Sequence, residues 1–594
     1  MKSPYNQNAR QLTIVAQDPA LRSSNGRILT AQIDVPLEQL EPGPRGYRVH
    51  LIDYDSTTKQ FFKPHAITPG GIGGYTDRYA QASNSELLDD PRFHAQNAYA
   101  ICMRILARFE FALGRRVSWS FGGHQLKIAP HAFADANAFY SRRDEGLFFG
   151  YFVSPFSKKL IYSCLSHDVV AHETTHALLD GLRERYLDPS SPDQAAFHEG
   201  FADVVAMLSV FSLKDVVGYL LDYGATQPVS KRDNRLIARK NLTRAALGKS
   251  VLLRLAEQMG SELSSIRGSA LRASYDLKPS SSYLQQDEFM EPHRRGEIFV
   301  AAILHAFVAA LVARLKPLGD VTPGHLDRNR VVEEAADVAD YLLTVCIRAI
   351  DYCPTVHLSF GDFLSAALTA DTELHPDDRR FQLRSTLRES FAAYGIVPAS
   401  KGDDGLWERP PDRLVYTHSR FESMQRDPDE VFRFLWENRH SLGMATDAHT
   451  RVLSVRPCLR VGPDGFFLRE TVTEYVQILK LSAHELSALK IRKPADMHND
   501  TEVTLYGGGM LLFDEYGRLK YHVRNRLLNT KLQSQRLMHL WNYGAFSKSA
   551  AARRRFSDLH RMRSIQRNAY SQERWLNDGN EEGNEITQAD IHQH

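Results

Sequence analysis

The sequence predicts an α+β fold, in which a region rich in strands and turns is followed by a mainly helical one. The segments "LTIVA" and "GYRVHLIDYD" and the turn cluster "TPGGIGGY" indicate strands and turns over residues 1–92. From Asp168 to about Tyr394 the hydrophobic pattern is mostly helical. At 594 residues the chain is longer than one hydrophobic core usually supports, so we expect roughly two to four domains.

The remaining segments continue this mixed pattern. A helix is expected through "AQNAYAICMRILARFEFAL", and strands up to "GLFFGYFV" follow it. Residues 397–413, "VPASKGDDGLWERPPDR", predict a linker, because Gly, Pro and charged residues replace the hydrophobic periodicity there. Residues 414–594 then form a second, mixed α/β region whose function the sequence does not indicate.

Three segments of this C-terminal region can be assigned from their patterns. "MLLFDEYGRLKYHV" predicts a β-hairpin that turns near Tyr516. "GGGM", which begins at Gly507, favours a tight turn between strands over a phosphate loop, because no Lys-Ser or Lys-Thr pair follows it. The basic segment 553–574 is typical of a solvated helix face, and the alternative is a binding patch for anions.

The composition argues against several classes of protein. Hydrophobic residues make up 43% of the chain and charged residues 24%, as in ordinary globular proteins. The formal net charge of +2 gives no reason to expect nucleic acid as a partner. The apolar segment Ile298–Leu315 contains His305 and falls short of the roughly 20 residues that a bilayer requires. We therefore expect a buried helix there and no membrane span.

Cysteine usage and the N-terminal segment bear on the compartment. The five cysteines are odd in number and scattered: Cys102, Cys164, Cys346, Cys353 and Cys458. They form neither a disulfide framework nor a Cys-x-x-Cys metal motif, which fits a reducing compartment. The first residues, "MKSPYNQNARQLTIVAQDPALR", have no apolar core of signal-peptide length. We expect the protein in the cytoplasm, with export by another route left open, and the oligomeric state is not indicated.

The segment "DVVAHETTHALLD", Asp168 to Asp180, carries two histidines four residues apart. On a helix His172 and His176 share one face, so both can direct a ring nitrogen at one metal ion. Glu173 lies one step around the helix and can reach a water molecule without binding that ion. This is the His-Glu-x-x-His spacing of zinc peptidases, although so short a motif also occurs by chance.

The next helix, in "SSPDQAAFHEGFADVVAML", has clear signals at its start. Ser191 is the expected N-cap, Pro192 occupies the first helical position, and Gln194 completes a capping box. These signals place Glu199 and Asp203 four residues apart on one face of the helix.

A catalytic zinc site usually has three protein ligands and an open position for water. Glu199 can be the third ligand after the two histidines, and Asp203 can accept a hydrogen bond from a ligand histidine's second nitrogen. The competing zinc pattern needs a third histidine six residues after His176, and Leu182 at that position excludes it.

With these residues in place, the sequence resembles the thermolysin-like zinc peptidases, a group of glutamate-zincins. "DVVAHETTHALLD" is similar to the active-site helix of that family over its whole length. "HEGFAD" resembles the family's Asn-Glu-x-x-Ser-Asp element, with His198 in the place of asparagine. The resemblance covers residues 93–396 and implies a two-lobed peptidase domain with a β-rich N-terminal lobe, a mainly helical C-terminal lobe and a Zn²⁺ cofactor.

Segments on either side of the active-site helix extend the resemblance. "NAFY" and "GLFFGYF" are similar to the edge strand that pairs with the substrate backbone, a role that falls on Asn137 and the backbone of Ala138. "GSALRAS" resembles the segment whose arginine, here Arg272, orients the peptide carbonyl. "EPHRRGEIFVAAILHA" resembles the element with a histidine that donates to the oxyanion, which falls on His293.

The resemblance defines three further roles less closely. The tyrosine that assists the oxyanion falls nearest to Tyr186. The carboxylate that orients His293 is either Asp287 or Glu288. Asp180 is expected to brace the site or cap the helix rather than take part in the chemistry.

The resemblance implies a zinc-dependent metalloendopeptidase that acts on polypeptides. Zinc would polarise the substrate carbonyl, Glu173 would act as general base toward the attacking water, and His293 would stabilise the oxyanion. An endopeptidase is favoured because the Gly-x-Met-Glu-Asn signature of related aminopeptidases is absent from the sequence. The alternative is a catalytically silent scaffold that binds a partner protein, although such a scaffold would have no use for Glu173.

Overall fold

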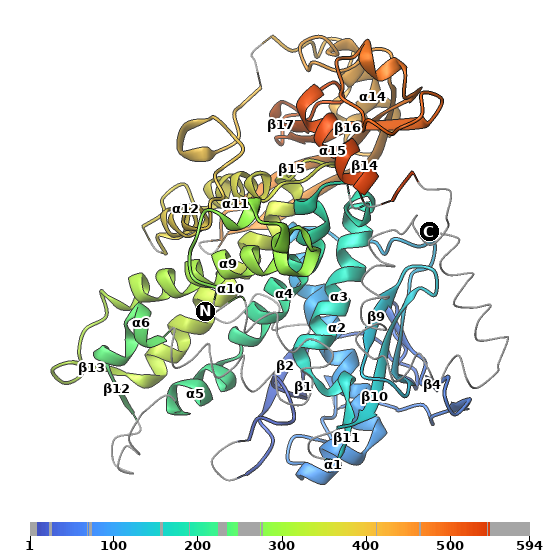
Figure 1. Ribbon diagram of the computed structural model, residues 1–594. Coiled ribbons are helices and arrows are strands. Elements are labelled where there is room, and N and C mark those ends of the chain that lie inside the picture. Colours follow the sequence, from blue (N-terminus) through green and yellow to red (C-terminus); the bar gives the residue numbers. More distant parts are fainter. Residues whose placement is uncertain are drawn as a thin grey trace.

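The computed structural model has an α+β fold, with helices through the middle of the molecule and strands at its two ends (Figure 1). The residues it describes are 9–22, 26–67, 69–70, 74–154, 158–188, 190–223, 235–247, 274, 277–379, 381–410, 413–462, 465–542 and 544–546. Arg272 and the basic segment 553–574 lie outside these residues.

The N-terminal region is rich in short strands, as predicted. They are β1 (Ala9–Val15), β2 (Thr30–Pro36), β3 (Val49–Leu51), β4 (Tyr54–Asp55), β5 (Gln60–Phe61), β6 (Pro69–Gly70), β7 (Gly74–Tyr75), β8 (Leu126–Phe133), β9 (Ala138–Ser141), β10 (Gly146–Val153) and β11 (Leu160–Tyr162). A mixed sheet has the order β11-β10-β8-β3, and β9 pairs antiparallel with β10. Among the described strands β9 has no second neighbour, so it is an edge strand.

The helix expected after the first strands is α2 (Pro91–Leu113), which follows the short α1 (Asn84–Asp89). Asp90 caps α2 by accepting a hydrogen bond from the backbone N–H of Arg92. Gly114 ends the helix in the left-handed conformation, with a φ of 68°. Helix α2 contacts β1, β2 and helix α3 (His167–Leu182).

The central region is helical, as predicted. Its main helices are α3 (His167–Leu182), α4 (Pro192–Phe211), α5 (Lys214–Tyr223), α6 (Arg244–Leu247), α9 (Pro292–Leu315), α10 (Arg328–Ala349), α11 (Phe360–Leu374) and α12 (Leu383–Ala393). Smaller elements are the 3₁₀ turns η1 (Ser163–Leu165), η2 (Glu184–Leu187), η3 (Arg239–Leu242), η5 (Tyr283–Gln285), η6 (Asp287–Met290), η7 (Ile350–Tyr352) and η8 (Asp403–Gly405), and strands β12 (Leu236–Ala238) and β13 (His325–Asp327).

Helix α4 begins where the sequence predicted, but its cap differs in one respect. Ser191 accepts a hydrogen bond from the backbone N–H of Gln194, and Pro192 lies in the first turn. The side chain of Gln194 does not complete a capping box. Its amide nitrogen donates to the carbonyl oxygens of Arg185 and Asp188 instead, which holds the connection between α3 and α4 in place.

Helix α9 contains the apolar segment Ile298–Leu315 and is buried, which confirms the prediction of a core helix. Among the described helices α9 alone is long and apolar enough to cross a membrane by itself, and 78% of its most apolar window is buried inside the protein. Helices α4 and α5 meet the same test only when taken together across a bend of 78°.

Helices α4 and α9 cross at two glycines. A Cβ atom on Gly200 would lie 3.1 Å from the carbonyl oxygen of Gly296 and 3.2 Å from the Phe299 ring. A Cβ on Gly296 would meet the backbone of Ala196 at 3.2 Å. The two backbones therefore approach more closely than larger residues at these positions would permit.

The C-terminal region contains a second sheet, antiparallel and in the order β14-β15-β16-β17. Its elements are α13 (Phe421–Met424), α14 (Pro428–Glu437), β14 (His449–Val461), β15 (Phe467–Ser482), η9 (Glu485–Ser487), β16 (Glu502–Phe513), β17 (Leu519–Asn525) and α15 (Thr530–Asn542). The predicted hairpin between β16 and β17 is confirmed, since Asp514 donates its backbone N–H to the Arg518 carbonyl and Gly517 has a φ of 82°.

The predicted turn at Gly507 is wrong, because "GGGM" lies inside strand β16. A Cβ on Gly507 would lie 2.5 Å from the backbone nitrogen of Leu527. Cβ atoms on the next two glycines would come within 2.4 Å of neighbouring backbone oxygens. The glycines thus permit close contact between chains and do not reverse the chain direction.

The C-terminal sheet is joined to the helical region by a shared core. Buried side chains of the sheet pack with the main hydrophobic core: Cys458, Val472, Met510, Leu512, Tyr521 and Val523. Alternate residues of β16, Leu511 and Phe513, face a separate cluster with α14. Both faces of the sheet are covered, which explains the uninterrupted apolar run in β16.

The predicted linker, residues 397–413, packs against the helical region where it is described. The indole N–H of Trp407 donates to the carbonyl oxygen of Tyr352, and its backbone N–H donates to the hydroxyl of Thr369. The proposed domain boundaries around residues 92, 396 and 413 stay a prediction.

A buried ionic network connects α3 to the C-terminal sheet. The carboxylate of Asp351, which is fully buried, accepts hydrogen bonds from Arg115 at 2.7 Å, Arg460 at 2.6 Å and Arg183 at 3.3 Å. Burial alone would raise the pKa of Asp351, but the arginines outweigh it and hold that pKa below its usual range. Arg183 is the C-cap residue of α3 and Arg460 lies on β14.

We expect Asp351→Asn to destabilise the protein by about 3–5 kcal/mol, because it leaves buried arginines without their counter-charge. The free energy of unfolding, measured with denaturant, checks this. The matched control is Glu502→Gln, which removes one partner of an exposed pair with Lys480 and should change stability by less than about 0.5 kcal/mol. Equal effects of the two substitutions would contradict the structural role of the network.

We expect Gly200→Leu to lower stability by about 1–3 kcal/mol or more, because α4 and α9 must separate to make room for the side chain. Gly319→Leu is the control, since Gly319 is exposed and a Cβ there meets no atom within 4 Å. Thermal unfolding of both variants measures the difference. An unchanged melting temperature for Gly200→Leu would show that the helix crossing tolerates a wider spacing.

Candidate metal centre

Helix α3 brings two imidazole rings together in the protein interior. His172 and His176 are 2% and 3% exposed, and their ring centroids are 4.3 Å apart at right angles. The spacing of four residues on one helix places them on the same face, as the sequence predicted.

Helix α4 supplies a carboxylate between these rings. The Nε2 atom of His172 lies 3.4 Å from one carboxylate oxygen of Glu199, and the Nε2 atom of His176 lies 3.6 Å from the other. One ligand atom from each of the three residues falls within 4.8 Å of the others, so together they could hold a metal ion. The donor set of two imidazoles and one carboxylate suits zinc.

Two further residues of α4 hold the histidines in position. Asp203 accepts a hydrogen bond from the Nδ1 atom of His172 at 2.8 Å, which leaves Nε2 of that ring directed at Glu199. The ring of His198 stacks on His176, with centroids 4.6 Å apart and planes within 12°. The sequence marked His198 only as a replacement for asparagine and did not indicate this stacking.

Glu173 lies beside the candidate ligands and is held by the edge strand β9. The residue is 1% exposed, and its carboxylate accepts a hydrogen bond of 3.1 Å from the backbone N–H of Tyr140. Since this N–H belongs to an edge strand, it is directed away from β10 and toward α3. Glu173 is therefore fixed by a neutral donor.

Asp180 holds the same tyrosine through its side chain. The Tyr140 hydroxyl donates to Asp180 at 2.8 Å, and the Arg142 guanidinium lies 3.6 Å from that carboxylate. Burial raises the pKa of Asp180, while Arg142 and the hydroxyl hydrogen bonds oppose the rise. Asp180 and Glu173 thus bind β9 to α3 at two points, which matches a bracing role for Asp180.

His293, at the start of α9, approaches the cluster from a third helix. Its Nε2 atom lies 3.6 Å from a carboxylate oxygen of Glu199, and its Nδ1 atom hydrogen-bonds to Glu291 at 2.9 Å. The predicted choice between Asp287 and Glu288 is therefore wrong for this structure. Glu291 is the N-cap of α9, and the sequence signal for it was its place directly before Pro292.

Glu297, one turn beyond His293, is a buried acid that sequence reasoning did not select. It forms an ion pair with Arg294, whose side chain is 36% exposed. Burial raises the pKa of Glu297 to about 7, and the nearby Asp203 carboxylate acts in the same direction.

Asn137 and Tyr186 were predicted to bind substrate and to assist the oxyanion, and their contacts in the structure are with other parts of the protein than the candidate ligands. Asn137 is buried, and its side-chain oxygen accepts a hydrogen bond from the backbone N–H of Ala138 at the start of β9. Tyr186 is fully buried, packs against Phe197, and donates its hydroxyl to the carbonyl oxygen of Pro354. These contacts give Tyr186 a packing role and direct its hydroxyl away from the ligands.

Comparisons with known proteins do not establish a family for this chain. No protein-family model matches the sequence, and no curated protein matches it. One solved structure similar to the chain is the precursor of protealysin, a metalloproteinase from Serratia proteamaculans, with a TM-score of 0.33 and 16% identity. The match covers 60% of this chain and 91% of that one. A likeness of this size does not establish a function.

We expect the double substitution His172→Ala and His176→Ala to leave one zinc ion fewer per chain than in the wild type, because it removes two of three candidate ligands. Metal analysis by mass spectrometry after dialysis measures the difference. His498→Ala, at an exposed histidine, is the control and should keep the wild-type zinc content. Equal zinc in the double variant and the wild type would contradict the assignment of these ligands.

Proposed function

We propose that the protein is a zinc-dependent metallopeptidase, and specifically an endopeptidase that cleaves polypeptides. The observation that carries this proposal is the place of Glu173. Its carboxylate lies next to the cluster of two histidines and Glu199 but is held by the backbone N–H of Tyr140. A cluster that bound a metal only for structure would need no such carboxylate.

His172, His176 and Glu199 would hold the zinc ion. When bound, zinc polarises a carbonyl group and lowers the pKa of a water molecule. The hydrogen bond from His172 to Asp203 keeps the ring in one tautomer and makes it a better electron donor.

Glu173 would act as the general base. It takes a proton from the attacking water and then gives that proton to the leaving amine of the substrate. The N–H of Tyr140 binds one carboxylate oxygen, so the carboxylate is held at a fixed orientation for both transfers.

The edge strand β9 would bind the substrate backbone. A peptide in extended form can add to its unpaired edge, next to Glu173, through main-chain hydrogen bonds. Such binding needs no free terminus, which supports cleavage inside a chain. His293, whose Nε2 atom lies 3.6 Å from Glu199, would donate a hydrogen bond to the oxyanion that forms on the substrate carbonyl. The proposed mechanism does not use Tyr186.

The second candidate function is a silent scaffold in which the C-terminal region binds a partner. The observation that favours a scaffold is the hydrophobic core that this region shares with the helices, because it makes the two parts one structural unit. The cytoplasm is the compartment that we propose, on the cysteine pattern alone.

We expect Glu173→Gln to reduce cleavage of an unfolded protein substrate by about 10²–10⁴-fold, equivalent to about 3–5 kcal/mol of activation free energy. Glutamine keeps the size of the side chain and can still accept the Tyr140 N–H, but it cannot take a proton. Zinc content and melting temperature should stay at their wild-type values.

The control for this substitution is Glu184→Gln, at an exposed glutamate in the turn after α3. It should leave the cleavage rate unchanged. A Glu173→Gln variant that retains zinc and cleaves at the wild-type rate would overturn the mechanism. A wild-type protein that binds zinc and cleaves no unfolded substrate would support the scaffold instead.

A further inference from the structure

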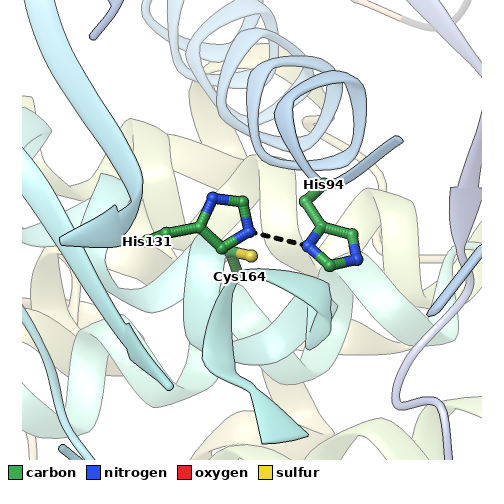
Figure 2. A group of neighbouring side chains, drawn as sticks. All are labelled: His94, His131 and Cys164. Atoms are coloured by element: carbon green, nitrogen blue, oxygen red, sulfur yellow. Dashed lines mark hydrogen bonds between the residues drawn. The ribbon is translucent and has the colours of Figure 1, made fainter. Parts of the chain in front are cut away.

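A second cluster of metal-binding side chains lies in the N-terminal region, formed by His94, His131 and Cys164 (Figure 2). His94 comes from α2, His131 from β8 and Cys164 from η1. One ligand atom from each falls within 4.8 Å of the others, and the three residues are at most 1% exposed. Figure 2 shows the cysteine sulfur beside the line that joins the two rings.

The hydrogen bonds on the outer side of each ring fix where its proton lies. The Nε2 atom of His94 is 2.9 Å from the carbonyl oxygen of Leu88, which can only accept, so the proton of this ring lies on Nε2. The Nδ1 atom of His131 is 2.8 Å from the Asp53 carboxylate, which also accepts, so the proton of this ring lies on Nδ1.

The two remaining nitrogens therefore both present lone pairs. They are the Nδ1 atom of His94 and the Nε2 atom of His131, and they face each other at 2.7 Å. Two lone pairs at this distance repel each other unless a positive charge lies between them. The sulfur of Cys164 is the third donor directed at the same point.

We propose that His94, His131 and Cys164 bind a divalent transition-metal ion, with zinc as the expected occupant. Thiolate and imidazole are the donors that zinc prefers in sites of this kind. A hydrogen bond from the outer nitrogen of a ligand histidine to a carboxylate, as between His131 and Asp53, is the usual support of such a ligand.

The geometry requires only a small adjustment for the ion. Zinc–nitrogen bonds of about 2.0–2.1 Å at a tetrahedral angle place the two nitrogens roughly 3.3 Å apart, so the rings would separate by about 0.6 Å. A pocket lined in part by Asp53, Phe62 and Pro91 lies next to the carboxylate that holds His131.

A cysteine nucleophile and a shared proton both fit this cluster less well than a metal ion does. The order Asp53, His131, Cys164 has the residue types of a cysteine hydrolase, but Cys164 is fully buried and burial raises its thiol pKa, so it is a poor nucleophile. A proton shared between the rings would be balanced by the Asp53 carboxylate, but it would not engage the buried sulfur of Cys164. A bound metal ion would instead deprotonate the thiol, and the thiolate would be its third protein ligand.

The site would hold the start of the active-site helix. Cys164 lies in η1, which leads through Ser166, the N-cap residue, into α3. A metal ion there would join this turn to α2 and to β8. This is a structural role, and it does not depend on the peptidase activity proposed above.

The experiment uses the full chain with His172→Ala and His176→Ala, so that only the second site can bind. This double variant should retain one zinc ion per chain. When loaded with Co²⁺ alone, it should show near-ultraviolet charge-transfer absorption from thiolate to cobalt, because the other candidate site contains no sulfur. Adding Cys164→Ala should remove both the ion and the absorption.

The matched control adds Cys346→Ala to the same double variant. Cys346 is equally buried and has no place in a metal-binding cluster of the described residues, so the ion and the absorption should persist. If Cys164→Ala does not fold, the absorption of the double variant still decides the question.

A double variant that binds no metal and shows no thiolate absorption would overturn the second site. If the wild type then still binds one zinc ion, the proposed peptidase centre would be unaffected. Loss of the absorption with Cys346→Ala and not with Cys164→Ala would also contradict the proposal.

Discussion

The candidate metal centre depends on how closely α4 can approach α9. Neither Gly200 nor Gly296 has a Cβ, and a Cβ on either would lie 3.1–3.3 Å from the backbone of the other helix. Because Glu199 directly precedes Gly200, and His293 lies three residues before Gly296, this crossing sets the distance between those two side chains. Helix α3 brings its histidines to the same carboxylate from the other side. A larger distance between α4 and α9 would move Glu199 away from His293 or from the two histidines of α3.

Helix α3 is also held along its length by contacts with β9 and with the C-terminal sheet. Tyr140 bridges from β9 to Glu173 with its N–H and to Asp180 with its hydroxyl. At the end of the helix, Arg183 bonds to Asp351, and its guanidinium lies 3.6 Å from Glu474 of β15. The C-terminal sheet therefore helps to position α3. The general base that we propose, Glu173, would need a fixed position, and the hydrogen bond from Tyr140 restricts its carboxylate.

The local part of this site could be predicted from the sequence, since helical periodicity alone places His172, Glu173 and His176. Glu199 and Asp203 followed from the same spacing in a helix with a recognisable N-cap. The partner of His293 could not be chosen in this way. Three acidic residues precede it within six positions, and only the turn of η6 into α9 decides that Glu291 is the one in contact. Tyr186 was placed by its distance along the chain, but its hydroxyl turns toward Pro354 because η2 begins immediately after α3.

The contacts that join distant segments left no mark that a single sequence could reveal. Arg115 and Asp351 are 236 residues apart, and His94 and His131 are 37 apart, so neither pair belongs to a repeating pattern. The C-terminal sheet was assigned to a separate region because Gly, Pro and charged residues interrupt the hydrophobic periodicity over residues 397–413. Residues that carry out chemistry can be recognised from local spacing, since a metal ion demands certain atoms at certain distances. The contacts that hold such residues in position can be made by many different combinations of residues. Only the folded chain shows which combination is present.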